Sequence, residues 1–208
     1  MPAAFQFDPD KVAYFETAGW KAYYDRNWLR AFTLMVRLNR EQFAMSWPAA
    51  VGAAVDVVRA SMAFAPVEND LPRTRRFLAR FYDKARRHVH LGADAATAAG
   101  LELDYWVVHR RLALERQQHP EAGNLEPLVA SLLRLHAVLF DAPAAAIRAS
   151  AEARACAAEA VDRITGGYSV DVDADWVAVE ENLRLPYRAV LPAQGSPSMT
   201  GNTPATTS

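Results

Sequence analysis

The stretch LEPLVASLLRLHAVLF, residues 125–140, decides the fold class. Apolar side chains recur in it every three or four residues, at Leu125, Val129, Leu132, Leu133, Leu139 and Phe140. This period places them on one face of an α-helix, and His136 falls on the same face. A buried imidazole needs a partner, because burying an unpaired polar group is costly. The stretch therefore predicts a buried helix that carries a polar group into the core.

The same period recurs along most of the chain. We expect helices over residues 10–26, 27–45, 46–65, 70–92, 94–118, 124–140, 144–167 and 174–185. The first two segments form either two helices or one long bent helix, and the last is expected to end at Pro186, which lacks a backbone N–H. Short connections favour antiparallel neighbours. The prediction is an all-α protein, a single antiparallel bundle of six to eight helices over residues 1–192, followed by a disordered tail over 193–208.

Composition and charge limit the classes of function. The 208 residues suffice for one sizeable core, and a net charge of −1 gives no general attraction to nucleic acid or to anionic membranes. The most apolar stretch, residues 47–66, contains Asp56 and Arg59, which a membrane span would have to bury. The single Cys156 and the absence of a signal-like N-terminus indicate a reducing compartment. We predict a cytoplasmic protein outside the membrane that forms a homo-oligomer, a dimer.

Several polar residues fall on or beside the apolar helix faces. Glu102, Trp106 and His109 share one edge of their helix because they lie four and three residues apart. Seven aromatic residues between Tyr14 and Phe32 form either a hydrophobic ligand wall with Glu16 as its polar anchor, or ordinary core. The residues predicted to bind a small ligand are Glu16, Trp20, Asn39, Glu102 and Trp106.

The histidines suggest a second use of the same interior. If the helices of His109 and His136 pair as a hairpin, two imidazoles and the carboxylate of Glu16 or Glu102 would suit a divalent transition metal. The alternative is that each histidine makes one ordinary hydrogen bond. A di-iron bundle would need two Glu-x-x-His pairs and covalent haem a Cys-x-x-Cys-His motif, and the sequence has neither. The candidate metal ligands are therefore His109, His136 and Glu16.

Two charged features have simpler interpretations. Asp56 and Arg59 lie one turn apart, which suits a clamp for a substrate carboxylate, although an ion pair on a solvated helix face is the favoured interpretation. Residues 70–91 carry a formal charge of +5, and such a helix can lie along a phosphate backbone. Its basic side chains spread around the helix, so nucleic acid is the least favoured partner.

These observations lead to one main functional prediction and two alternatives. The main prediction is a helical bundle with an internal polar pocket that binds a metal or a small ligand, with an oxidoreductase-like metal enzyme as its catalytic form. The first alternative is a non-catalytic interaction or structural protein whose buried polar groups fix helix packing. The weaker alternative is anion or nucleic-acid binding through the basic helix, residues 73–87.

Overall fold

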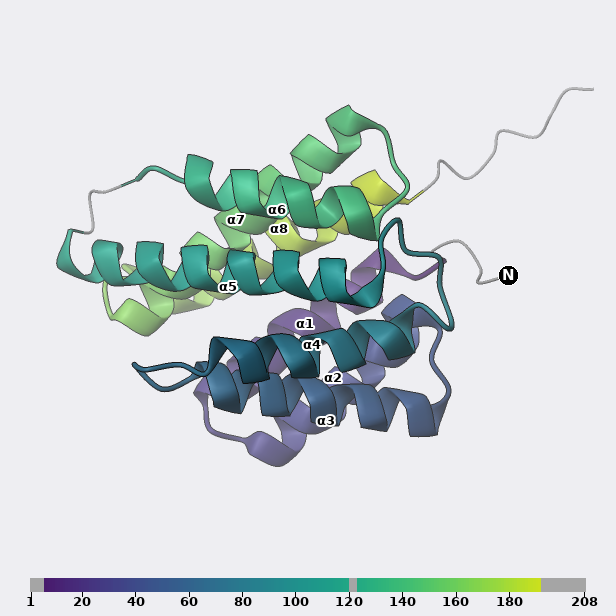
Figure 1. Cartoon of the computed structure of the whole chain (residues 1–208). Coiled ribbons are helices and arrows are strands. Elements are labelled where there is room, and N and C mark those ends of the chain that lie inside the picture. Colours follow the sequence, from purple (N-terminus) through teal and green to yellow (C-terminus); the bar gives the residue numbers. More distant parts are fainter. Residues whose placement is uncertain (1–5, 120–122, 192–208) are drawn as a thin grey trace, which may run out of the picture.

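A computed structural model describes residues 6–119 and 123–191, and within these ranges the protein is all-helical (Figure 1). The eight helices are α1 (Pro9–Tyr24), α2 (Trp28–Phe43), α3 (Trp47–Phe64), α4 (Leu71–Ala85), α5 (Ala95–Gln118), α6 (Glu126–Leu139), α7 (Ala144–Gly166) and α8 (Val172–Val190). The predicted fold class, an all-α helical bundle, is confirmed. The predicted tail, residues 193–208, lies outside the described residues.

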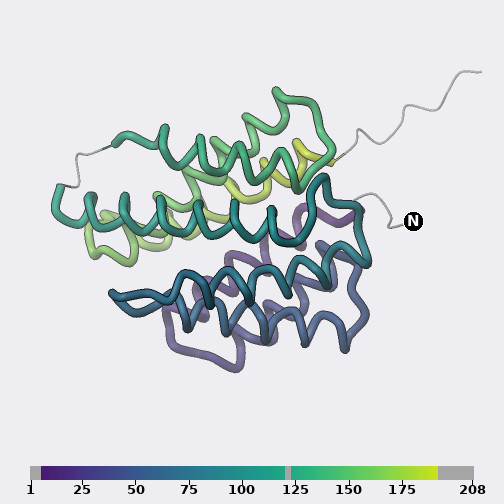
Figure 2. Tube along the Cα trace, viewed as in Figure 1, coloured from purple at the N-terminus to yellow at the C-terminus, as the bar shows by residue number. Residues whose placement is uncertain are grey.

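The helices form a closed ring. Each helix packs against the next one in the chain, and α8 packs against α1. In Figure 1, α4 and α5 lie side by side at the front, with α1 and α8 behind them, and the tube in Figure 2 shows the chain running back and forth between the two ends. An additional contact between α5 and α7 narrows the ring. Side chains from all eight helices therefore meet inside it.

Local signals start the helices where the sequence predicts them. The Asp94 carboxylate accepts a hydrogen bond from the backbone N–H of Thr97 at 2.7 Å, and the Asp70 carboxylate accepts one from that of Arg73 at 2.9 Å. A capping side chain of this kind satisfies a backbone donor that has no partner within the helix. Asp171 caps α8 in the same way, by accepting a hydrogen bond from the Ala174 N–H at 3.0 Å.

The first two helices are separate, so the single bent helix is excluded. Arg26 has a φ of 57°, in the left-handed region that non-glycine residues rarely adopt. The next residue, Asn27, caps α2 by accepting a hydrogen bond from the Arg30 N–H at 3.2 Å. The reversal brings α1 against α2. It also leaves Trp28 58% exposed, although the sequence predicts it on the inward face.

Two predicted helix ends are wrong because tertiary packing overrides the local signal. The helix expected to reach Gly92 ends at Ala85, and the following residues turn back so that the Gly92 N–H donates to the Val138 carbonyl at 2.8 Å. Conversely, α8 continues past Pro186 to Val190. An interior proline costs about 3 kcal/mol. Burial of Pro186 and of Tyr187 beside it against α1 offsets that cost.

The inward face of α3 is not formed by its large apolar side chains alone. Val51 and Met62 are 42% and 70% exposed. The face that packs against the neighbouring helices consists of alanines, among them Ala50, Ala53 and Ala60, which are fully buried. Small side chains allow close helix approach, and a pattern based on large apolar residues misses such a face. None of the described helices is both long and apolar enough to cross a membrane.

Candidate functional site

A cavity of about 580 Å³ occupies the interior of the ring. Its volume lies within the range of about 300–1,000 Å³ that is typical of small-molecule sites, and 12 of its lining residues are aromatic. Four lining residues, Tyr23, Tyr24, Ala65 and Thr165, are exposed and therefore mark its rim. All the site residues predicted from the sequence line this cavity: Glu16, Trp20, Asn39, Glu102, Trp106, His109 and His136.

Helix α7 runs along the cavity and orders its polar groups by depth. Ser150, Arg154, Ala158 and Asp162 lie four residues apart and line one side, with Thr165 at the rim. Since a helix rises about 1.5 Å per residue, Ser150 lies about 18 Å along α7 from Asp162. The Ser150 end is thus the deep end of the cavity, and the Asp162 end is close to the rim.

About a third of the way along α7 from Ser150 to Asp162, a buried ion pair joins three helices. The Arg154 guanidinium of α7 donates two hydrogen bonds to the Glu16 carboxylate of α1, at 2.5 and 3.2 Å. The Tyr187 hydroxyl of α8 donates to the same carboxylate and accepts from Arg154 at 3.1 Å. Burial acts to lower the pKa of Arg154, but the Glu16 carboxylate together with Tyr187 and Tyr105 outweighs it, and that pKa lies well above its usual range. Burial and the adjacent carboxylate both raise the pKa of Tyr187.

Glu102 of α5 is held on the opposite side of the ring. Its carboxylate accepts hydrogen bonds from the Tyr82 hydroxyl of α4 at 2.9 Å and from the Trp106 indole N–H at 2.7 Å. Burial raises the pKa of Glu102, and the two donors and the charge of Arg154 only partly oppose that effect. Two donated hydrogen bonds fix the carboxylate in place, so Glu102 and Trp106 form one rigid unit of the wall.

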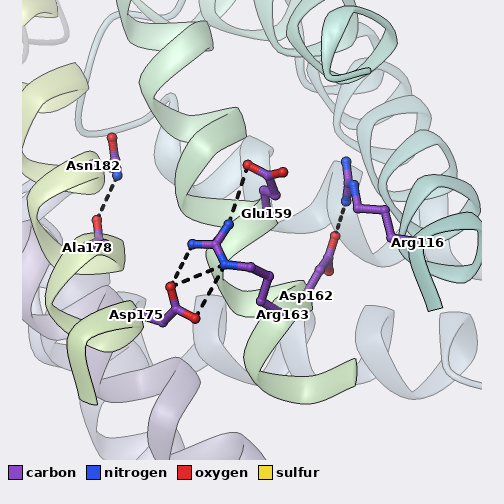
Figure 3. Close-up of polar contacts among 7 residues, drawn as sticks. All are labelled: Arg116, Glu159, Asp162, Arg163, Asp175, Ala178 and Asn182. Atoms are coloured by element: carbon purple, nitrogen blue, oxygen red, sulfur yellow. Dashed lines mark hydrogen bonds and ion pairs between the residues drawn. The ribbon is translucent and has the colours of Figure 1, made fainter. Parts of the chain in front are cut away.

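Near the rim, His109 and Arg116 of α5 share one carboxylate of α7. The His109 Nε2 lies 2.9 Å from one oxygen of Asp162. The other oxygen of Asp162 accepts a hydrogen bond from the Arg116 guanidinium, and Figure 3 shows this second contact. The His109 ring stacks on Tyr105, with centroids 5.9 Å apart. Figure 3 also shows the Arg163 guanidinium joined to Asp175 and Glu159, a set that ties α7 to α8.

At the deep end, His136 of α6 lies beside Ser150, with its Nδ1 2.9 Å from the serine hydroxyl. The side chain is only 4% exposed, and burial lowers the pKa of His136 to about 3, assisted by the positive charge of Arg154. The imidazole is therefore neutral at physiological pH. Its Nε2 makes no hydrogen bond to any residue in the described ranges.

Asn39 of α2 contributes another polar group without a partner. Its side chain is 3% exposed, and its amide nitrogen has no hydrogen-bond partner among the described residues. Tyr105 is similarly buried, and its hydroxyl makes no hydrogen bond within the same ranges. Because native proteins pair nearly all their buried polar groups, orphans that line a cavity point to a missing partner inside it.

The predicted metal ligands do not converge. His109 pairs with Asp162 and His136 with Ser150, about 18 Å apart along α7, and Glu16 is engaged by Arg154 between them. Nowhere in residues 6–119 and 123–191 do three or more His, Cys, Asp or Glu side chains gather in a way that could hold a metal ion. Helices α5 and α6 do pack against each other, as the hairpin assumed, but both imidazoles reach α7 instead of each other.

The two other charged features of the sequence, the Asp56–Arg59 pair and the basic segment 73–87, contain residues that form ion pairs outside the cavity. Asp56 is buried and pairs with Lys84 and, at 3.3 Å, with Arg80 of α4, so the predicted surface pair with Arg59 is wrong. Arg87 of the basic segment also has a carboxylate partner, Asp83. Part of the positive charge of residues 73–87 is therefore neutralised within the fold.

The sequence analysis did not identify the partners of the predicted cavity residues. Glu16 is bound by Arg154 and Tyr187, and Glu102 by Tyr82. His136 lies beside Ser150, and His109 beside Asp162. Arg154 is flanked by alanines in a segment with no large apolar stripe, and Tyr187 follows the proline that was expected to end the helix. One signal was available: four-residue spacing puts Ser150, Arg154 and Asp162 on one face of their helix.

Comparisons of the chain with protein-family models, with curated proteins and with solved structures find no match. The function is therefore argued from the chemistry of the cavity alone.

Proposed function

We propose that this protein binds a small organic molecule in the central cavity. The observation that carries the proposal is the unpaired amide of Asn39, buried in a wall that also holds the unpaired Nε2 of His136. An unsatisfied buried donor costs about 1–3 kcal/mol. A ligand that accepts its hydrogen bond would recover that cost, whereas a role in packing alone would favour an apolar residue at this position.

The aromatic wall supports an organic ligand. Trp20, Trp106 and Tyr105 line the cavity together with several phenylalanines, and such rings supply apolar contact area. Because the described residues gather no ligand set for a metal, the proposal does not extend to the metal-dependent enzyme. Homo-oligomer formation stays a prediction.

The alternative structural role is favoured for one group of residues only. Glu16, Arg154 and Tyr187 satisfy one another and connect α1, α7 and α8, where the ring closes. We assign these three to fixing the ring. The ligand-binding role is assigned to Asn39 and His136, with Trp20 and Trp106 as wall.

Blocking the rim tests the proposal. Ala113 lines the cavity close to the rim, and Leu114 beside it is 53% exposed and lies outside the lining. The full chain would be examined by native mass spectrometry for a retained molecule and by thermal shift against a library of neutral aromatic compounds. We expect ligands that raise the melting temperature of the wild type and of Leu114→Trp, but not of Ala113→Trp. Ligands that act equally on both variants, or no ligand at all, would refute the proposal.

A further inference from the structure

We infer that the ligand of the central cavity is an uncharged molecule whose hydrogen-bond acceptor, of the ketone or amide carbonyl type, enters first and binds Asn39 and His136 at the deep end. This inference rests on the proposed function and specifies the chemical class that the cavity would take. It depends on three features: which cavity charges are already paired, which protons the unpaired groups carry, and where these groups lie along the cavity.

The charged groups of the inner cavity already have partners. Arg154 is bound by Glu16, Asp162 is bound by Arg116 and His109, and Glu102 accepts two hydrogen bonds. A carboxylate on the ligand would lose its hydration without gaining a free counter-charge, and the desolvation of an unpaired ion is prohibitive. An ammonium group would meet only Glu102, whose carboxyl already accepts two hydrogen bonds and whose pKa is raised by burial. The interior therefore suits a neutral molecule.

Arg110 is the exception, and its position limits what it can bind. It lines the cavity but has no carboxylate partner among the described residues; its guanidinium lies 3.8 Å from the centroid of the Phe64 ring and donates to the Pro66 carbonyl at 3.2 Å. Phe64 and Pro66 flank the rim residue Ala65. An anionic ligand would thus be held at the rim, about three turns of helix from Ser150.

Counting protons identifies His136 as a donor. The Ser150 hydroxyl has no partner in the described ranges other than His136 Nδ1. If the hydroxyl donates to Nδ1, both atoms are satisfied and Nε2 carries the remaining proton. The other tautomer leaves the serine proton and the Nε2 lone pair both unpaired. The first arrangement leaves fewer buried groups unsatisfied and is preferred. The imidazole does not change charge near neutral pH, since burial lowers its pKa to about 3.

Asn39 supplies the second donor in the deeper part of the cavity. Helix α1 ends beside the rim at Tyr24, and α2 starts at Trp28 and runs inward. Asn39 lies eleven residues into α2, about 16 Å from that end. Two neutral N–H donors, Asn39 Nδ2 and His136 Nε2, thus lie away from the rim. A carbonyl oxygen has two lone pairs and suits such donors.

Three probes of one shape test the chemistry: 1-indanone with a ketone, indane with no oxygen, and indane-1-carboxylate with a negative charge. Isothermal titration of the full chain at pH 7.5 should give 1-indanone the lowest Kd, about tenfold or more below both others. Asn39→Leu should bring the affinity for 1-indanone down to that for indane. Thr17→Val is the matched control, since Thr17 is also buried and unpaired but does not line the cavity, and it should leave all three affinities unchanged.

A second measurement keeps the test decisive if Asn39→Leu does not fold. The carbonyl stretching frequency of bound 1-indanone should be lower than in an aprotic solvent, and a frequency equal to that in hexane would overturn the inference. Binding of the carboxylate as tight as that of 1-indanone, lost in Arg110→Met, would also overturn it by assigning an anionic ligand to the rim. In that event the proposed binding function would stand. If no probe binds, no molecule is retained and Ala113→Trp has no effect, the binding function itself fails.

Discussion

The Tyr187 hydroxyl donates a hydrogen bond to the Glu16 carboxylate across 171 positions of sequence. It joins the last helix to the first and thereby closes the ring. Arg154 adds the opposite charge from α7, so three helices meet at one buried carboxylate. All three residues of this junction line the cavity, so the junction forms the part of the wall where α1 meets α8.

Breaking this junction should destabilise the protein strongly. Arg154→Met would leave the Glu16 carboxylate buried without a counter-charge, which typically costs about 3–5 kcal/mol. Tyr187→Phe would remove one hydrogen bond to a charged group and should cost about 1.5–3 kcal/mol. Urea unfolding monitored by circular dichroism would give both values.

An exposed pair is the control for this prediction. Arg148 and Glu152 also lie on α7, at 3.1 Å, but both side chains are more than half exposed, so Arg148→Met should cost less than about 0.5 kcal/mol. The double variant Glu16→Leu/Arg154→Met should be more stable than Arg154→Met alone, because it removes the buried charge with its partner. Equal costs for Arg148→Met and Arg154→Met would contradict the role assigned to the junction.

A second buried carboxylate predicts unequal effects of removing two cations near the C-terminal end of α4. Asp56 is almost fully buried, and Lys84→Met would leave it with Arg80 as its remaining cationic partner; we expect a loss of about 2–3 kcal/mol. Arg87→Met removes an equally close partner, but the carboxylate of Asp83 is half exposed and water replaces the arginine. That variant should unfold within about 0.5 kcal/mol of the wild type. Chemical denaturation of the two variants side by side checks the contrast.

Local signals in the sequence were sufficient for the helices and for the polar residues of the interior. Asp70 and Asp94 cap helices because the capping interaction spans only three residues, and such short-range chemistry is legible in a single sequence. His136 stands out because its neighbours form an apolar stripe. Asn39 and Glu102 were found by the same contrast, and all three line the cavity.

The side-chain partners across the ring could not be predicted from the sequence in the same way. Which side chain meets Glu16 depends on how α1, α7 and α8 rotate about their axes, and many arrangements satisfy the same apolar pattern. His109 lies on an edge that faces α7, so Asp162 is its partner, whereas the sequence suggested His136 on the adjacent helix. Pro186 was misleading because tertiary burial of Tyr187 outweighs the local cost of a proline.

The free energy of unfolding should depend on pH partly through the low pKa of His136. Burial lowers its pKa to about 3 from an ordinary value of 6.5, so the unfolded state binds a proton that the folded state excludes between these values. The free energy of unfolding should therefore fall as the pH is lowered from 6.5, by about 2 kcal/mol at pH 4.5 from this group. The raised pKa of Glu102 acts in the opposite direction, so the comparison must be made between variants.

His136→Gln isolates that contribution. The variant should lose less stability than the wild type between pH 6.5 and 4.5 when urea unfolding is measured at both values. His90→Gln, at an exposed histidine, should follow the wild type. A wild-type curve parallel to that of His136→Gln would mean that the imidazole is accessible to protons in the folded state, against its burial beside Ser150.

Asn39 should show a conflict between stability and binding. Its buried amide nitrogen is unpaired within the described residues, as is the hydroxyl of Thr17, so both groups pay a desolvation cost without a hydrogen bond. Asn39→Leu and Thr17→Val replace these groups by apolar ones of similar size, and each should raise the free energy of unfolding of the ligand-free protein by about 1 kcal/mol. A loss of stability in Asn39→Leu but not in Thr17→Val would show that the amide already has a partner, such as an ordered water. Added 1-indanone should then raise the melting temperature of the wild type and of Thr17→Val but not of Asn39→Leu, because Asn39 is a lining residue of the cavity and Thr17 is not. A protein selected for packing alone would gain from both substitutions, whereas one selected for binding has reason to keep the less stable asparagine.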